Sequence, residues 1–225
     1  MITVFAGYDP REAVGYSVFC QSLIEHTARP VAIIPTFGKQ RDGTNVFIYQ
    51  RFLVPYLMGF KGHAIFMDAS DMLMLSNIDE LDRLFDSTKA VQVVKHDYKT
   101  KHKKKYINTA MESKNEDYPR KNWSSLIIWN CEHPANRLLT PDYVDEHTGS
   151  ELHRFEWLKD EQIGELPKEF NFLVGEQDMG YAKIAHYTLG IPEFPYYSGC
   201  DYSKQWHNTK SRMLNGLINM KESHA

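Results

Sequence analysis

The stretch that most constrains the fold is AIFMDASDMLML at residues 64–75. An apolar run of four residues ends at Asp68, and Asp71 stands immediately before a second apolar run. A short apolar run bounded by polar residues is typical of a buried strand. Because ligands of open α/β sheets bind beyond the carboxyl ends of the strands, we expect Asp68 to lie at the edge where chemistry takes place.

The segments on either side of this stretch alternate between strand and helix patterns. We expect strands at residues 2–6, 31–34, 64–67, 90–94 and 126–129, and helices at residues 10–26, 48–58 and 78–85. Pro55 is expected to kink the second of these helices. A strand, a helix and a second strand form a unit with a right-handed crossover, so the pattern predicts one α/β domain for a chain of this length.

The composition is that of an ordinary globular protein. With 42% hydrophobic residues, 24% charged residues and no internal repeat, it excludes low-complexity, collagen-like and coiled-coil chains. The net charge of -3 gives no general attraction to nucleic acid, and no apolar run reaches the about 18 residues that suggest a transmembrane segment. The first residues lack the pattern of a signal peptide, and Cys20, Cys131 and Cys200 are too far apart for paired-cysteine motifs. We therefore expect a cytoplasmic protein in a reducing compartment.

Residues 95–105 form the one dense basic segment of the sequence, with six lysines. Such runs are usually solvated loops. The same segment can be a mobile loop that closes over an anionic donor or attracts an anionic acceptor. Because the lysines are not interleaved with a set of stacking aromatic residues, no specific nucleic-acid partner is expected.

Asp68 and Asp71 form the pair with the clearest chemical meaning. Two carboxylates between apolar runs are costly to bury unless they meet a cation or hydrogen-bond donors. A divalent ion takes oxygen ligands and can hold a diphosphate at the same time. Such pairs also cap the segment that follows them, so the local sequence leaves metal binding and capping as equal alternatives.

Motifs over most of the chain resemble the GT-A glycosyltransferases of family 8, which include the glycogenin-like and lipopolysaccharide galactosyltransferase-like enzymes. They are AGYD at residues 6–9, YQRFLVPYL at 49–57, the Asp pair, NIDEL at 77–81, YPRKNWSS at 118–125, WNC at 129–131, LHRFEWL at 152–158 and HYTLG at 186–190. The segment YPRKNWSS is similar to bacterial and phage members in particular.

This resemblance implies a single GT-A (Rossmann-like) domain in residues 1–207, with a mixed, mostly parallel central sheet flanked by helices. Residues 1–95 would form the nucleotide-binding half, and residues 96–207 the half that shapes the sugar and acceptor sites. The remaining residues, 208–225, are expected to form a helical tail, because Leu214, Leu217 and Ile218 recur at helical spacing.

The metal motif of the family is Asp-x-Asp, and this sequence departs from it by one residue. Either Ser70 is an insertion and Asp71 takes the second ligand position after Asp68, or Ser70 occupies that position by strict count. A bulge can absorb one residue and preserve the site. The resemblance supplies His186 as third ligand, whereas the local sequence alone favours a hydrogen-bonded core histidine. The implied ion is Mn or Mg.

The resemblance also assigns residues to the donor, each with a plainer alternative. Arg51 would stabilise the leaving diphosphate, or be a surface arginine. The nucleoside pocket would be formed by Tyr8, Asp9 and Arg11, which otherwise make a turn with a capping Asp.

The sugar would be contacted by two further groups of residues. Asp160 would hold sugar hydroxyls and Glu161 would approach the anomeric face, although both can equally be exposed acids at the end of a helix. Ser124 and Ser125 match a sugar-contacting segment, with Asn122 as a substitute.

The resemblance, together with the Asp pair, therefore implies a metal-dependent hexosyltransferase that moves a sugar from a UDP-sugar to a glycan, lipid or protein acceptor, with retention of configuration. Two other functions stay open. A non-catalytic module that binds nucleotide-sugar or glycan is favoured by the interrupted metal motif. A metal-dependent phosphohydrolase could use the same Asp pair.

Overall fold

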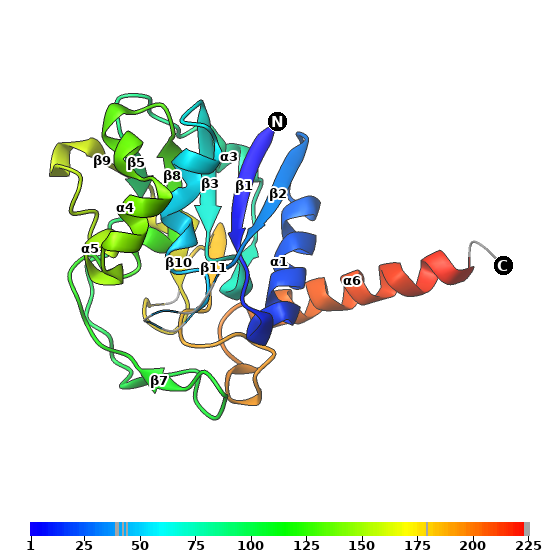
Figure 1. Cartoon of the computed structure of the whole chain (residues 1–225). Coiled ribbons are helices and arrows are strands. Elements are labelled where there is room, and N and C mark those ends of the chain that lie inside the picture. Colours follow the sequence, from blue (N-terminus) through cyan, green and yellow to red (C-terminus); the bar gives the residue numbers. More distant parts are fainter. Residues whose placement is uncertain (39–40, 42, 44, 179, 223–225) are drawn as a thin grey trace.

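A six-stranded mixed sheet lies at the centre of the computed structural model (Figure 1). The structure describes residues 1–38, 41, 43, 45–178 and 180–222, and of residues 217–222 the helical backbone alone. The strand order is β2-β1-β3-β8-β5-β9. The strands are β1 (Ile2–Gly7), β2 (Val31–Thr36), β3 (His63–Met67), β5 (Val91–Val93), β8 (Leu126–Asn130) and β9 (Ile163–Glu165). β1 pairs in parallel with β2 and β3, β5 pairs in parallel with β9, and β8 runs antiparallel between β3 and β5.

Helices cover both sides of this sheet, and two small sheets complete the fold. The helices are α1 (Ala13–Glu25), α2 (Val54–Leu57), α3 (Ile78–Asp82), α4 (Pro141–Glu146), α5 (Gly149–His153) and α6 (Ser203–Glu222). Figure 1 shows α1 and α6 on one side of the central strands and α4 and α5 on the other. The second sheet has the order β10-β11-β4, from Phe172–Leu173, Ile184–His186 and Met72–Met74. β6 (Lys104–Lys105) and β7 (Ser113–Lys114) form an antiparallel pair, and Figure 1 shows β7 below the central sheet.

The apolar runs of the sequence are strands that are buried on both faces. Along β3, Ala64 and Phe66 belong to one apolar cluster, and Ile65 and Met67 belong to another. Successive side chains of a strand point to opposite faces, so the two clusters lie on the two sides of the sheet. This explains why the strand pattern is a continuous apolar run rather than an alternation.

Two details at prolines differ from the sequence prediction. Residues 48–58 do not form one kinked helix, because a 3₁₀ turn at Gln50–Leu53 leads into α2, and Pro55 stands in the first turn of α2. The missing N–H of proline costs nothing there. β2 continues through Pro35 to Thr36, which an edge strand tolerates because one of its sides is unpaired.

The C-terminal helix begins at Ser203, five residues before the predicted tail. Trp206 is 1% exposed and packs in an apolar cluster with Val18 of α1 and Tyr187, whereas Leu214 is 44% exposed. The predicted contributions of Leu217 and Ile218 lie outside the described side chains. Among the described residues, none of the helices combines the length and the apolar character needed to cross a bilayer.

Candidate metal and donor site

A tight 3₁₀ turn at Ala69–Asp71 absorbs the extra residue between the two carboxylates. The Ser70 hydroxyl donates to the carbonyl of Gly7 at 3.1 Å and accepts the backbone N–H of Asp9 at 3.1 Å. Ser70 is therefore tied to the loop after β1, while Asp68 and Asp71 both line one cavity. Of the two alignments that the sequence allowed, the geometry places Asp71, and not Ser70, beside Asp68.

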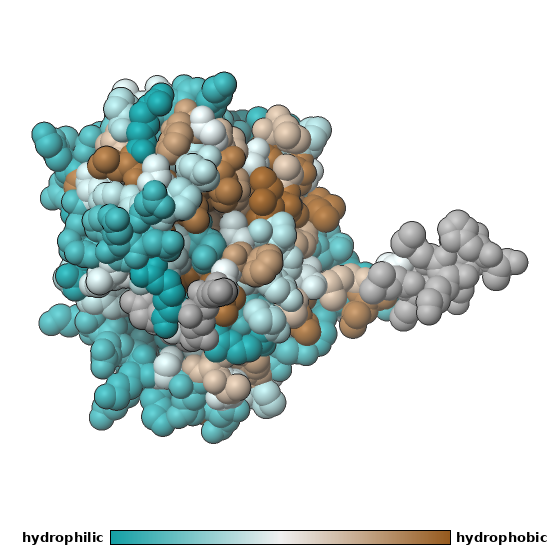
Figure 2. Space-filling model, viewed as in Figure 1, coloured by the Kyte–Doolittle hydropathy of each residue, from teal (hydrophilic) through white to brown (hydrophobic). Residues whose placement is uncertain are grey.

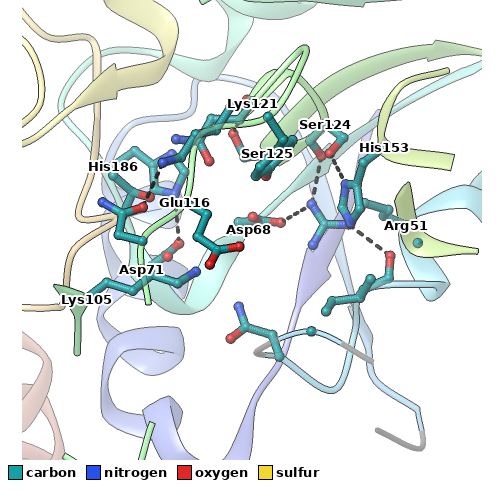
Figure 3. A pocket seen from close by; sticks show the side chains of 18 of the residues that line it. Arg51, Asp68, Asp71, Lys105, Glu116, Lys121, Ser124, Ser125, His153 and His186 are labelled. Atoms are coloured by element: carbon teal, nitrogen blue, oxygen red, sulfur yellow. Dashed lines mark hydrogen bonds and ion pairs between the residues drawn. The ribbon is translucent and has the colours of Figure 1, made fainter. Parts of the chain in front are cut away.

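The second sheet brings His186 to this pair of carboxylates. In the β4–β11 register His186 lies opposite Met72, the residue after Asp71, and the backbone N–H of Tyr187 donates to the Asp71 carbonyl at 2.8 Å. The potential ligand atoms of Asp68, Asp71 and His186 lie within 4.8 Å of one another, and all three side chains are buried (Figure 3). We call these three residues the triad.

Asn171 fixes which nitrogen of His186 faces the triad. Its amide NH₂ donates to the Ser125 hydroxyl at 2.8 Å, so its amide oxygen faces His186 Nδ1 at 2.9 Å. The hydrogen-bond network therefore assigns the proton to Nδ1 and leaves a lone pair on Nε2. A metal-binding histidine is usually oriented in this way by a hydrogen bond at its other nitrogen.

The triad fits a divalent cation. His186 Nε2 lies 3.3 Å from Asp71 Oδ1, so in the assigned tautomer two lone pairs face each other. Among the described residues, this buried Asp71 oxygen accepts no hydrogen bond. A cation bound by both atoms removes this unfavourable contact, and two carboxylates with one imidazole suit Mn²⁺ or Mg²⁺.

Arg51 anchors the other side of the triad. Its guanidinium forms an ion pair with Asp68 at 2.8 Å and donates to the carbonyls of Ile48 and Ser124 at 3.1 and 2.9 Å. Arg51 is only 3% exposed, so it is a buried residue of the site and not a surface arginine. Burial raises the pKa of Asp68 to about 6, against the opposing effect of Arg51 and with a further increase from Asp71.

A cavity of about 580 Å³ opens in front of the triad. Pockets of this size accommodate small ligands. Besides the triad and Arg51, its walls come from four parts of the chain. They are Gly43, Asn45 and Ile48 before Arg51, residues 105–106 with several residues between 114 and 125, then Gly149, Ser150 and His153 of α5, and finally Thr188 after His186.

Residues 95–121 make up much of one cavity wall, and we call this segment the basic arm. It carries nine Lys and Arg residues against four Asp and Glu residues, in a chain whose net charge is -3. Figure 2 shows hydrophilic residues at the lower left of the molecule, where Figure 1 places β7 of this arm. Lys105, Lys114 and Lys121 line the cavity, so part of the basic segment belongs to the site.

Two residues that the sequence assigned to the sugar lie outside the cavity. Asp160 and Glu161 belong to a 3₁₀ turn before β9. The triad lies near the end of the sheet where Met67 of β3 pairs with Leu126 of β8. β9 begins beside Val91 of β5, which pairs with Trp129 near the other end of β8. The turn before β9 is therefore at the other end of the strands from the triad. Asp160 is exposed and forms an ion pair with Arg120. This placement agrees with the alternative in which the two residues are exposed acids.

The expected nucleoside residues are found in the loop after β1 but not among the residues that line the cavity. Asp9 is fully buried and holds the Arg11 guanidinium at 2.9 and 2.6 Å and the N–H of Val46 at 3.3 Å. Burial raises the pKa of Asp9, but the hydrogen bonds and charge of Arg11 together outweigh it and hold this pKa below its usual value. The ring of Tyr8 packs edge-on against Tyr16.

The segment after the basic arm places Ser124, Ser125 and Asn122 on the cavity wall, and their contact with a sugar stays a prediction. The Ser124 hydroxyl lies 2.5 Å from Nδ1 of His153, a residue that the sequence analysis did not assign to the site. Burial, with a smaller effect of the nearby Arg51 charge, lowers the pKa of His153 well below its usual value. His153 is therefore a neutral hydrogen-bond partner at neutral pH.

Known structures define the class of fold. Galactosyltransferase LgtC, solved with donor and acceptor sugar analogs, superposes with a TM-score of 0.63 and 12% identity over 94% of this chain and 96% of that chain. The bifunctional glycosyltransferase WbbM gives 0.63 and 15%, and GlyE of Streptococcus pneumoniae gives 0.61 and 12%. The match to WbbM covers 93% of this chain and about half (49%) of WbbM. The match to GlyE covers 98% of this chain and 63% of GlyE. The fold is therefore that of the GT-A glycosyltransferases.

Sequence similarity defines the family more narrowly. Protein CDI of Arabidopsis thaliana is 39% identical over 224 residues, which cover 91% of this chain and 84% of that protein. This chain belongs to the same family as Protein CDI. No family model matches the sequence. The closeness to bacterial and phage members stays a prediction.

Proposed function

We propose that this protein is a metal-dependent glycosyltransferase that uses a UDP-sugar as donor. The observation that carries the proposal is the triad, which lies beyond the carboxyl end of β3 in a GT-A fold and faces a cavity of about 580 Å³. Asp68, Asp71 and His186 would hold Mn²⁺ or Mg²⁺, and the bound ion would neutralise charge on the diphosphate. Retention of configuration is part of the proposal and rests on the family resemblance alone.

The residues around the triad suit a diphosphate leaving group. Arg51 is fixed by Asp68 and two backbone carbonyls, and a guanidinium that is already oriented loses little freedom when it binds a phosphate oxygen. Lys105 lines the cavity from the basic arm and brings a second cation. Preorganised positive charge stabilises the negative charge that develops on a departing phosphate. The nucleoside would extend from here toward the loop that carries Tyr8.

The first test is UDP binding measured by calorimetry with Mn²⁺ and after chelation. We expect binding that requires Mn²⁺ and that is lost in Asp71→Ala, because this variant removes one ligand of the proposed ion and leaves Asp68 in place. Asp201→Ala is the matched control, since Asp201 is an exposed carboxylate outside the cavity lining. It should bind UDP as the unchanged protein does.

Other outcomes point to the competing functions. Binding of UDP that ignores Mn²⁺ would contradict a metal-held diphosphate and favour a non-catalytic binding module. Release of inorganic phosphate from a simple phosphate ester, without UDP binding, would favour the phosphohydrolase. Where UDP does bind with Mn²⁺, release of UDP from UDP-glucose, UDP-galactose or UDP-N-acetylglucosamine identifies the usable donor.

A further inference from the structure

Asp160 and Glu161 lie outside the cavity lining, so the cavity lacks the two carboxylates that the sequence assigned to the sugar. Among the described residues, three carboxylates line the cavity: Asp68, Asp71 and Glu116. The first two belong to the triad. Glu116 comes from the basic arm, and Figure 3 shows its side chain pointing into the cavity.

Glu116 is not committed to a structural interaction. In the part of the chain that the structure describes, no hydrogen bond or ion pair ties its carboxylate to another residue, whereas Glu112 on the same arm forms an ion pair with Lys104 at 2.5 Å. The two acids of the triad are held differently, Asp68 by Arg51 and Asp71 beside His186. Glu116 is therefore the cavity carboxylate that remains available to a ligand.

The backbone that carries Glu116 is held in place by its neighbour Asn115. The N–H of Asn115 donates to the carbonyl of Lys103 at 3.0 Å, and its side-chain NH₂ donates to Thr100 and to the buried Glu176 at 2.7 and 3.0 Å. The Asn115 side-chain oxygen accepts from Lys121 at 2.7 Å. Three of these four bonds join Asn115 to other residues of the arm, and the fourth, to Glu176, ties the arm to the rest of the protein.

Two further points of the arm are constrained as well. Tyr106 is 2% exposed, has a φ of 55° and donates its N–H to the carbonyl of Leu189, while Arg120 has a φ of 59°. Non-glycine residues persist in the left-handed region only where their surroundings determine the conformation. The arm therefore presents the exposed side chain of Glu116 to the cavity from a defined backbone.

We propose that Glu116 is the carboxylate that faces the donor sugar and stabilises positive charge at its anomeric carbon. In the transfer step the bond between this carbon and the diphosphate oxygen breaks, and its electron pair leaves with the diphosphate. The acceptor oxygen attacks the same carbon, and its proton passes to the departing phosphate oxygen. Glu116 forms no bond in this step and is unchanged at its end. The inference rests on the proposed function, because it needs a sugar diphosphate in the cavity.

The test uses the first of UDP-glucose, UDP-galactose and UDP-N-acetylglucosamine that the unchanged protein hydrolyses with Mn²⁺, with water as acceptor and UDP release as the readout. Glu116→Gln keeps the shape of the side chain and removes its charge. We expect kcat to fall about 100-fold, the usual size of such an electrostatic contribution, while the Kd for UDP with Mn²⁺ changes less than about twofold. Glu112→Gln, the control on the same arm, should keep the kcat of the unchanged protein.

A second variant separates a catalytic charge from a structural role. Glu116→Ala should be equally slow, and added formate should restore part of its rate, because a small carboxylate can occupy the space of the missing one. Normal turnover by Glu116→Gln would overturn the inference and leave the proposed function intact. An equal loss of UDP affinity and kcat would also overturn it, because Glu116 would then organise the donor site as a whole. A lack of UDP binding by the unchanged protein would instead overturn the proposed function together with the inference.

Discussion

Asp68 shows how burial and charge oppose each other at a single residue of the site. Burial raises its pKa to about 6, Asp71 acts in the same direction, and the ion pair with Arg51 limits the increase. A metal ion binds the deprotonated carboxylate, so protons compete with Mn²⁺ below this pKa. We expect the affinity for Mn²⁺ to be nearly constant from pH 7 to 8 and to fall by up to about tenfold per pH unit below pH 6.

Calorimetry at pH 5, 6 and 7.5 in matched buffers checks this pH dependence. Asp68→Asn, which cannot titrate at this position, should bind Mn²⁺ weakly at all three values. An affinity of the unchanged protein that is the same at pH 5 and 7.5 would contradict the role of Asp68 as a titrating ligand.

The sequence predicted the candidate ligands but not what orients them. Asp68 and Asp71 stand out locally because two acids interrupt apolar runs, and the resemblance added His186. Asn171 and His153 had no such signal, because their roles depend on the contacts Asn171–His186 and Ser124–His153, which join residues 15 and 29 positions apart. Asp160 and Glu161 were assigned to the sugar, but they lie in the turn before β9, at the other end of the strands from the triad.

At the scale of elements, α1 holds the turn that carries the second carboxylate of the triad. A Cβ on Gly15 would lie 2.1 Å from the carbonyl oxygen of Ser70, a backbone atom that no side-chain rotation can move away. Gly15→Ala must therefore displace α1 or the Ala69–Asp71 turn. We expect it to cost about 1–3 kcal/mol of the free energy of unfolding and to weaken Mn²⁺ binding, because Asp71 moves with the turn.

Denaturant unfolding and Mn²⁺ calorimetry measure both effects. Gly216→Ala is the matched control, since no atom lies within 4 Å of a Cβ at this position of α6. Alanine in an exposed helix stabilises by up to about 1 kcal/mol relative to glycine, so this control should be as stable as the unchanged protein or more stable. Equal stability of Gly15→Ala and the unchanged protein would show that α1 does not fix the turn.

The same scale explains why some elements were predictable and others were not. Strands such as β1 and β3 are apolar runs bounded by turn signals, so the sequence located them to within a residue or two. β4, β10 and β11 have two or three residues each, which is too short for any periodicity. Their pairing depends on contacts such as His186 with Met72, more than 100 residues apart in sequence.

At the scale of the molecule, the two halves that the sequence distinguished are interleaved in space. β8, from the predicted sugar-shaping half, lies between β3 and β5 of the nucleotide-binding half. The triad combines Asp68 and Asp71 from the first half with His186 from the second. We therefore expect the halves to unfold together, because neither completes the sheet or the site alone.

Trp206 extends this coupling to the C-terminal helix. It is buried in the apolar cluster that joins Val18 of α1 to Tyr187, the residue after the His186 ligand, and α6 also pairs with α1 through Arg212 and Glu25. Trp206→Ala should lower the free energy of unfolding by about 3–5 kcal/mol in a single transition seen alike by circular dichroism and fluorescence. Leu214→Ala, on the exposed side of the same helix, should change it by less than about 0.5 kcal/mol. A Trp206→Ala protein that unfolds in two separate steps, or that is as stable as Leu214→Ala, would show that α6 is an appendage rather than part of the cooperative unit.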